Sequence, residues 1–179
     1  MSGSTGSESE GSGVAERLER LEHRLGQLED QAAIASLIAG YGPLADSSQG
    51  DAVRDMWVEE GGTYELQGYH FTSADMAATV TSDLHQRFVS MGCAHTLGPA
   101  RIWLDGDTAV AVNYSVVFVH NDGRWVAERV AANHWDLTRT AAGWRVRRRV
   151  NRLLDGGPEA VAILAGDEPL GTRRPRPDE

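Results

Sequence analysis

Two β-rich segments joined by an Asp-Gly turn constrain this sequence more than any other feature. Residues 102–104 run into the turn at 105–107, and residues 108–119 follow as a long β-rich segment. Asp-Gly between two such segments is the strongest short-range signal for a β-hairpin. A histidine, His95, stands just ahead of the first strand, so residues 92–120 place an ionisable ring at the mouth of a mostly apolar hairpin.

The segments around this hairpin predict helices first and strands afterwards. Apolar spacing predicts helices over residues 14–30, 32–46, 52–57 and 75–90, and a short strand over 63–66. Further strands are predicted over residues 125–139 and 144–154, joined by turns of a few residues. Helices segregated from an antiparallel meander are typical of an α+β fold. We therefore expect a curved, mixed or antiparallel sheet packed against N-terminal helices, forming a cone whose mouth can hold a small molecule.

Composition excludes several classes of partner. The 179 residues contain 17 Lys and Arg against 26 Asp and Glu, a net charge of −9. Nucleic acids and anionic membranes need a positive surface, so we expect neither as a partner. The single cysteine, Cys93, excludes an internal disulfide and a multi-cysteine metal site. The N-terminus has neither the basic nor the apolar region of a secretory signal, so a cytoplasmic protein is expected.

The ends of the chain differ in character from the middle. Residues 1–13 are almost all Gly, Ser and Glu, which predicts disorder. Residues 14–30 form the amphipathic helix, whose leucines Leu18, Leu21, Leu25 and Leu28 are spaced by three and four. This stripe fits a helix lying on its own domain or a zipper between subunits, and a bend is expected near residue 31. Residues 31–155 form the predicted domain, and residues 156–179 form a C-terminal tail.

Four segments together resemble one known family. They are LIAGYGPLADSSQGDAVRDMW, EEGGTYEL, CAHTLGPARIWLDGDTAVAVNY and LTRTAAGWRVRRRV. Their order and spacing over residues 28–155 resemble the SnoaL-like branch of the nuclear transport factor 2-like (NTF2-like) superfamily. The resemblance implies a cone fold like that of scytalone dehydratase and ketosteroid isomerase, and relatives that include lyases, polyketide cyclases and epoxide hydrolases alongside catalytically silent proteins.

The resemblance also implies a catalytic pair. In the dehydratase and dehydrochlorinase branches an Asp at the end of the first helix pairs with a His before the hairpin, and these positions are Asp46 and His95 here. The chain departs from the dehydratase pattern in having Ala45 where that branch has a Tyr. The second active-site histidine of that branch has two candidate counterparts, His120 and His134.

The chemistry of such a pair is general acid/base catalysis. Asp46 would accept a hydrogen bond from one ring nitrogen of His95 and so raise the basicity of the other nitrogen. In the alternative, Asp46 caps a loop and His95 is an ordinary edge histidine. A Cys93–His95 nucleophile is disfavoured because the sequence offers no evident oxyanion hole.

Strand alternation and aromatic content supply the candidate substrate contacts. Asn133 and Trp135 share one strand face, expected to be the interior, while His134 and Asp136 share the other. Tyr114 has the parity of a face that is either cone interior or subunit interface. The arginines Arg145, Arg147 and Arg149 alternate and are expected to meet the acidic surface. The full set of candidate substrate contacts is Tyr41, Trp57, Tyr64, Phe88, Tyr114, Asn133 and Trp135.

The sequence thus predicts a cofactor-independent lyase or isomerase, of dehydratase or cyclase type. It would act on a hydrophobic, oxygenated small molecule with a pH–rate inflection near 6 to 7. Two alternatives stay open: a non-catalytic small-molecule-binding or dimerisation protein, and an epoxide hydrolase. The second apolar face of the sheet predicts a homodimer or higher homo-oligomer.

Overall fold

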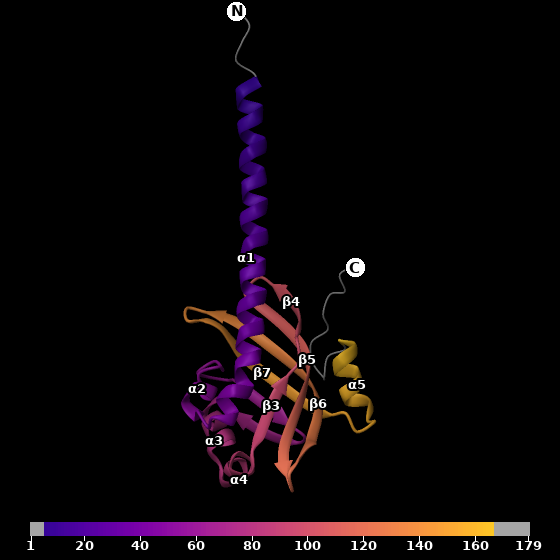
Figure 1. Ribbon diagram of the computed structural model, residues 1–179. Helices are drawn as coiled ribbons and strands as arrows, with labels where there is room; N and C mark the ends of the chain where they lie inside the picture. Colours follow the sequence, from indigo (N-terminus) through magenta and orange to yellow (C-terminus); the bar gives the residue numbers. More distant parts are fainter. Residues whose placement is uncertain (1–5, 167–179) are drawn as a thin grey trace, which may run out of the picture. The chain divides into compact units, whose positions relative to one another are not determined.

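The computed structural model describes the backbone of residues 6–166 and the side chains of residues 13–166. Two compact units are present, residues 1–33 and residues 34–179. Helix α1 (Gly6–Asp46) begins in the first unit and ends in the second (Figure 1). It begins inside the stretch 1–13 that composition predicted to be disordered, and the rest of that stretch, residues 1–5, lies outside the described residues. It also runs through residue 31, where no Gly or Pro interrupts it.

The second unit is built on a seven-stranded mixed sheet, which confirms the predicted α+β class. Its strand order is β2-β1-β7-β6-β5-β3, with β4 also paired to β5. The β1–β7 pairing is parallel and the others are antiparallel. The strands are β1 (Thr63–Leu66), β2 (Tyr69–Thr72), β3 (Cys93–Leu97), β4 (Arg101–Asp105), β5 (Thr108–Asn121), β6 (Arg124–Thr140) and β7 (Gly143–Leu153).

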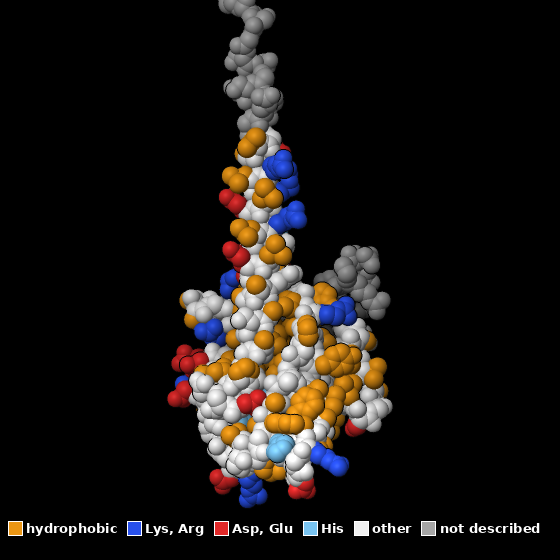
Figure 2. All heavy atoms as spheres, viewed as in Figure 1, with side chains coloured by type: hydrophobic (Ala, Val, Ile, Leu, Met, Phe, Trp, Pro, Cys, Tyr) orange, Lys and Arg blue, Asp and Glu red, His pale blue; other side chains and the backbone are white. Residues whose placement is uncertain are grey.

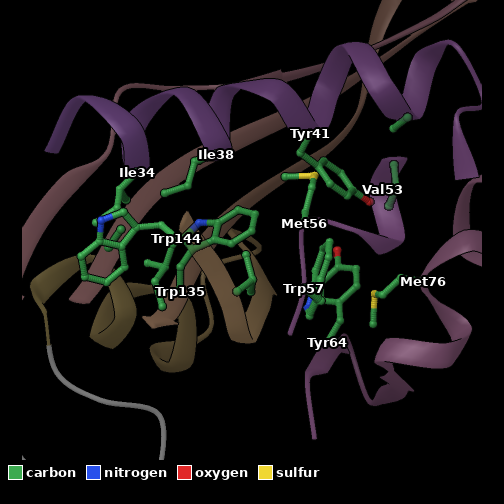
Figure 3. Packing of buried hydrophobic residues seen from close by; sticks show 14 of the residues in the cluster. Ile34, Ile38, Tyr41, Val53, Met56, Trp57, Tyr64, Met76, Trp135 and Trp144 are labelled. Atoms are coloured by element: carbon green, nitrogen blue, oxygen red, sulfur yellow. The ribbon is translucent and has the colours of Figure 1, made fainter. Parts of the chain in front are cut away.

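The main core lies between one face of this sheet and the helices that cover that face. The helices are the end of α1, α2 (Gly50–Arg54), the 3-10 turn η1 (Ser73–Asp75), α3 (Met76–Thr81) and α4 (Asp83–Met91). Ile34 and Ile38 of α1 are buried against this inner face, together with Trp135, Leu137 and other apolar side chains. Figure 3 shows Ile34, Ile38 and Tyr41 pointing from α1 into this core.

The helix predicted over residues 75–90 is wrong in one respect, because the chain breaks at Ser82. Ser82 has an extended backbone and its hydroxyl accepts a hydrogen bond from the backbone N–H of His85, so it caps a new helix, α4. N-cap serines favour this geometry over continuing a helix. The break rotates the second half, so that Leu84 is 65% exposed and His85 is buried.

The outer face of the sheet carries a second, smaller core. Helix α5 (Pro158–Ala165) packs Ala160 and Ile163 against Val112, Ala132 and Val150. Figure 1 places α5 across the sheet from α2, α3 and α4. Part of the segment predicted to be a tail is therefore a helix, because its apolar side chains find this surface. Residues 167–179 lie outside the described residues, and no helix within residues 6–166 is long and apolar enough to cross a membrane.

A β-bulge in β7 changes which side chains face inward. Trp135 pairs with Arg149 and Asp136 with Arg148, but Leu137 pairs with Val146. Arg147 is therefore an extra residue without a partner position, and alternation is shifted by one residue across it. As a result Val146 and Arg149 both face the main core, although their spacing of three residues would put them on opposite faces of a regular strand.

Candidate active site

Asp46 and His95 lie in direct contact at the junction of α1 and β3. Asp46 is the last residue of α1, and His95 is the central residue of β3. The two are joined by His95 Nδ1 and Asp46 Oδ1 at 2.6 Å and by the backbone N–H of His95, which donates to Asp46 Oδ2 at 2.8 Å. The side chain of His95 is 10% exposed and that of Asp46 is 24% exposed. The carboxylate therefore holds both the ring and the backbone of His95.

A glycine in α1 makes this contact geometrically feasible. A Cβ built on Gly42 would overlap the carbonyl oxygen of His95 and lie 3.2 Å from its carbonyl carbon. The backbone of β3 thus passes directly against α1, one turn before Asp46. The missing side chain at position 42 leaves room for this approach, so Gly42 sets the distance between the helix and the strand that carry the pair.

Replacing Gly42 with alanine is expected to destabilise the protein by about 1–3 kcal/mol, because the added methyl group must push backbone apart. The matched control is Gly40→Ala on the same helix, where a Cβ meets none of the described atoms within 4 Å. That change is expected to be neutral or to stabilise by about 0.5–1 kcal/mol through helix propensity. Urea denaturation of the two variants measures both effects, and equal effects would contradict the close-approach role of Gly42.

The Asp46 contact determines which nitrogen of His95 can act as a base. An ionised carboxylate only accepts hydrogen bonds, so His95 Nδ1 must carry the proton. In the neutral ring Nε2 then holds a free lone pair. Burial lowers the pKa of His95 below its usual value of 6.5, and the Asp46 carboxylate opposes this only in part. At neutral pH His95 is therefore an uncharged ring poised to accept a proton at Nε2.

Two further side chains surround the pair. His85 of α4 lies with its ring 5.4 Å from that of His95, and its Nε2 is 2.8 Å from the backbone oxygen of Ala45. Cys93 donates its thiol proton to Asp46 Oδ1 at 3.3 Å. Burial and the neighbouring carboxylate raise the pKa of Cys93 to about 11, so it is a thiol rather than a nucleophilic thiolate.

Three of these four side chains also have the spacing of a metal site. Asp46, Cys93 and His95 offer ligand atoms within 4.8 Å of one another. A metal would need a thiolate and free carboxylate oxygens, whereas here the thiol holds its proton and both oxygens of Asp46 accept hydrogen bonds. In this structure the donor set forms a hydrogen-bonded cluster of an imidazole, a carboxylate and a thiol.

A buried arginine surrounded by aromatic rings lies on the inner face beside this cluster. Arg149 of β7 is 3% exposed. Its guanidinium carbon lies 4.4 Å from the Tyr41 ring, 4.7 Å from Tyr64 and 4.3 Å from Trp135. Stacking of a guanidinium on aromatic faces offsets part of its desolvation cost. Figure 3 shows Tyr41, Tyr64 and Trp135, which come from α1, β1 and β6.

The hydrogen bonds of Arg149 are made to an amide rather than to a carboxylate. Its Nε and Nη2 donate to Asn133 Oδ1 at 3.0 and 2.8 Å, and Asn151 Nδ2 donates to the same oxygen at 2.9 Å. Asn133 is itself oriented by its donation to the Ser115 hydroxyl. Arg149 Nη1 and Asn151 Oδ1 are buried and have no hydrogen-bond partner among the described residues. A buried cation with an unused donor is an exception that needs an explanation, such as a bound water, an ion or a ligand.

Tyr41 lies between the two groups. Its ring is 6.4 Å from that of His95 and in contact with Arg149. Burial raises the pKa of the Tyr41 phenol to about 12, against the opposing charge of Arg149. The hydroxyl therefore keeps its proton and can donate a hydrogen bond. His95, Tyr41 and Arg149 thus place a base, a neutral donor and a cation in succession along the core.

The remaining candidates from the sequence fall in different places. Trp57 and Tyr64 belong to the aromatic group, with ring centres 6.2 Å apart. Phe88 is half-buried on α4, about one turn after His85. Tyr114 lies on the other face of β5 and is 53% exposed, so it is not brought together with the rest. Asn133 and Trp135 face inward as alternation predicts, and Asn133 contacts Arg149 rather than an open space.

The counterparts of a second catalytic histidine do not meet His95. His134 lies on the outer face of β6, where its Nε2 is 2.9 Å from Asp136. His120 stacks on Trp125 at the far end of β5. The histidine that does lie beside His95 is His85. An unbroken helix over residues 75–90 would turn His85 outward, so periodicity missed it; the Ser82 N-cap is the signal that identifies it.

Comparison with solved structures supports the fold independently. An NTF2-like protein with a cystatin-like fold from Novosphingobium aromaticivorans is 46% identical over 82% of this chain and 96% of its own, with a TM-score of 0.80. A Mycobacterium tuberculosis protein of unknown function is 19% identical over 79% of this chain and 88% of its own (TM-score 0.65). Aln2 from a Streptomyces species is 20% identical over 69% and 90% (TM-score 0.62). The last two show the fold alone.

The family follows from sequence. None of the curated proteins matches the chain. Residues 26–150 match the SnoaL-like domain (SnoaL_4), which agrees with the span 28–155 on which the resemblance rested. Together with the cone-shaped α+β architecture and the 46% identical NTF2-like structure, this match shows that the chain belongs to the SnoaL-like family of the NTF2-like superfamily.

Proposed function

We propose that this protein is a cofactor-independent lyase or isomerase that acts on a hydrophobic, oxygenated small molecule. The observation that carries the proposal is the Asp46–His95 pair, whose geometry leaves Nε2 of a neutral, buried ring as a base. The SnoaL-like family includes isomerases, cyclases and hydroxylases, so the fold is compatible with this chemistry. Arg149 and Tyr41 supply the electrostatic support that such a reaction needs.

The first step is removal of a proton from carbon. His95 Nε2 takes the proton of a C–H bond next to a substrate carbonyl, so a new N–H bond forms and the electron pair moves onto the carbonyl oxygen. Asp46 stabilises the resulting imidazolium through Nδ1. The enolate oxygen receives hydrogen bonds from the Tyr41 hydroxyl and from the unused donor on Arg149. Donors already in place where negative charge develops are the largest single contribution in many enzymes.

The second step returns the proton. In an elimination the enolate expels a hydroxyl group from the adjacent carbon, and the proton on His95 Nε2 leaves with it as water. In an isomerisation the same proton is delivered to a different carbon and the double bond moves. Both outcomes restore neutral His95, and both use the same base, so the substrate alone decides between them.

The alternatives are distinguished by this chemistry. A non-catalytic binding protein would use the aromatic group and Arg149 to hold an anionic or oxygenated ligand without moving a proton. An epoxide hydrolase would need carboxylates that activate water. Here Asp46 is committed to hydrogen bonds with His95 and Cys93, and Asp136 lies on the outer face of the sheet, so that alternative is less well supported.

Deuterium exchange tests the proposal even while the natural substrate is unidentified. The protein is incubated in D₂O with a panel of hydrophobic ketones, β-hydroxyketones and unsaturated ketones. We expect deuterium incorporation, or loss of water, at carbons next to the carbonyl for at least one chemical class. Tight binding of panel members without any exchange or elimination would identify a binding protein instead.

The rate of that exchange should increase with pH. Because only neutral His95 accepts a proton, the rate is expected to rise with pH through the pKa of His95 and then to stay constant. Burial lowers this pKa, so the inflection is expected below 6.5, which excludes the upper half of the range of 6 to 7 that the sequence suggested. A profile measured between pH 4 and 8 checks this, and an inflection above 7 would contradict the assigned base.

A further inference from the structure

The first unit of the chain carries an exposed apolar stripe that the proposed function does not use. Val14, Leu18, Leu21, Leu25 and Leu28 lie on α1 and are 69%, 55%, 49%, 56% and 62% exposed. Figure 2 shows hydrophobic side chains repeated along this helix, with charged side chains between them. A row of exposed leucines of this kind marks an interaction surface rather than ordinary surface variation.

The spacing of the stripe defines a heptad register. Alternating steps of four and three place Val14, Leu21 and Leu28 at position d and Leu18 and Leu25 at position a. These are the positions that interlock when two helices form a coiled coil, and leucine at d suits a parallel two-stranded arrangement. Residue 32, an alanine, occupies the next a position, after which the buried face of α1 begins at residue 34.

The charged residues that flank the stripe indicate the identity and the direction of the partner helix. In this register Arg17 and Arg24 fall at position g, and Glu22 and Glu29 fall at position e. In a parallel pair, g of one helix faces the e position five residues later in its partner. In such a pair Arg17 would face Glu22 of a second copy, and Arg24 would face Glu29. An antiparallel pair would instead bring Arg against Arg and Glu against Glu.

The segment that carries the stripe is already helical in the single chain. Short isolated helices are marginal because nucleation is costly. Here α1 is one continuous helix from Gly6 to Asp46, and its last turns are fixed by buried residues of the second unit, including Ile34 and Ile38. The segment that carries the stripe therefore extends an existing helix, which lowers the entropy lost on association.

We propose that residues 14–32 form a parallel, two-stranded coiled coil with the same segment of a second copy of this chain. The surface is apolar enough to need a partner, and the e and g charges are complementary to themselves only in the parallel arrangement. This interface is independent of the proposed catalytic function, because it involves none of the residues around His95.

A cross-linking experiment on the full chain tests the pairing and its direction. Val14→Cys is introduced in a Cys93→Ser background, so that position 14 carries the one thiol. In a parallel pair the two d positions lie side by side, within the Cα separation of about 4.4–6.8 Å that a disulfide needs. Mild oxidation is expected to yield a disulfide-linked dimer. Failure to cross-link would overturn the proposal.

Charge reversal supplies the matched controls. Arg17→Glu with Arg24→Glu, and separately Glu22→Arg with Glu29→Arg, should each abolish cross-linking of the Val14→Cys chain, because each puts like charges at facing positions. Mixing the two reversed chains should restore it as a heterodimer. The changes are on exposed helix positions, and the readout is local, so association through another surface does not affect it. The proposed pairing would be contradicted if either charge-reversed chain alone cross-linked as well as the Val14→Cys chain. It would also be contradicted if the mixture of the two reversed chains did not cross-link.

Discussion

Replacing His95 with alanine is expected to lower the rate of proton exchange by about 10²- to 10⁴-fold, the contribution of a positioned general base. The variant removes the ring whose Nε2 is freed by the Asp46 carboxylate at the α1–β3 junction. The fold should persist, because the backbone N–H of residue 95 can still donate to Asp46. The rate is measured on the substrate class found by deuterium exchange, together with circular dichroism and the urea midpoint.

The chain offers a matched control for this variant. His134 also contacts an aspartate, with Nε2 2.9 Å from Asp136, and its side chain is 3% exposed. It lies on the outer face of the sheet, so His134→Ala removes a comparably buried His–Asp pair away from the candidate site. We expect this variant to lose stability but keep its rate. Equal loss of rate in both variants would mean that His95 acts through the fold and not through chemistry.

Replacing Arg149 with methionine is expected to reduce the rate by about 10²- to 10³-fold, the usual cost of losing one donor that stabilises developing negative charge. Methionine is similar in length and apolar, so it can occupy the space among Tyr41, Tyr64 and Trp135. Arg149→Lys keeps the charge but not the planar fork, and it should recover part of the rate. The effect should appear mainly in kcat, because the charge develops after binding.

Arg148 provides the control for this second variant. It is the preceding residue of β7, is half-buried, and lies on the outer face 3.8 Å from Asp136. Arg148→Met should leave the rate unchanged. If Arg149→Met retains full activity and changes only the free energy of unfolding, then Arg149 is a structural cation and the proposed support for the enolate is wrong.

The inner face of the sheet could be anticipated from local patterns, whereas the Asp46–His95 pair was anticipated from the family resemblance. The Asp-Gly turn and the alternation along residues 125–139 predicted the hairpin and the inward direction of Asn133 and Trp135, because turn chemistry and two-residue periodicity are local properties. Family resemblance placed Asp46 and His95 at corresponding positions. Their contact requires α1 and β3 to approach closely at Gly42, and the distance between a helix and a strand is set by the tertiary structure.

The position of Arg149 could not be predicted from local sequence patterns. Regular alternation put it with Arg145 and Arg147, facing an acidic surface, whereas the bulge at Arg147 turns it into the core among aromatic rings. A bulge depends on how two strands pair over their whole length, and no residue type in β7 predicts its position. The position of His85 beside His95 was not predicted for a related reason, because the N-cap at Ser82 divides a helix whose apolar spacing is continuous.

Composition and periodicity predicted the α+β class and the helix that carries the leucine stripe, because these are local properties of the chain. The resemblance of four segments predicted the family and the candidate Asp46–His95 pair. Which side chains meet depends on the tertiary structure. Burial lowers the pKa of His95 and raises the pKa of Tyr41, so His95 keeps a free lone pair and Tyr41 keeps its proton. The burial of Arg149 depends on contacts with residues far apart in the chain. Burial and long-range pairing are properties of the packed core and not of any local segment.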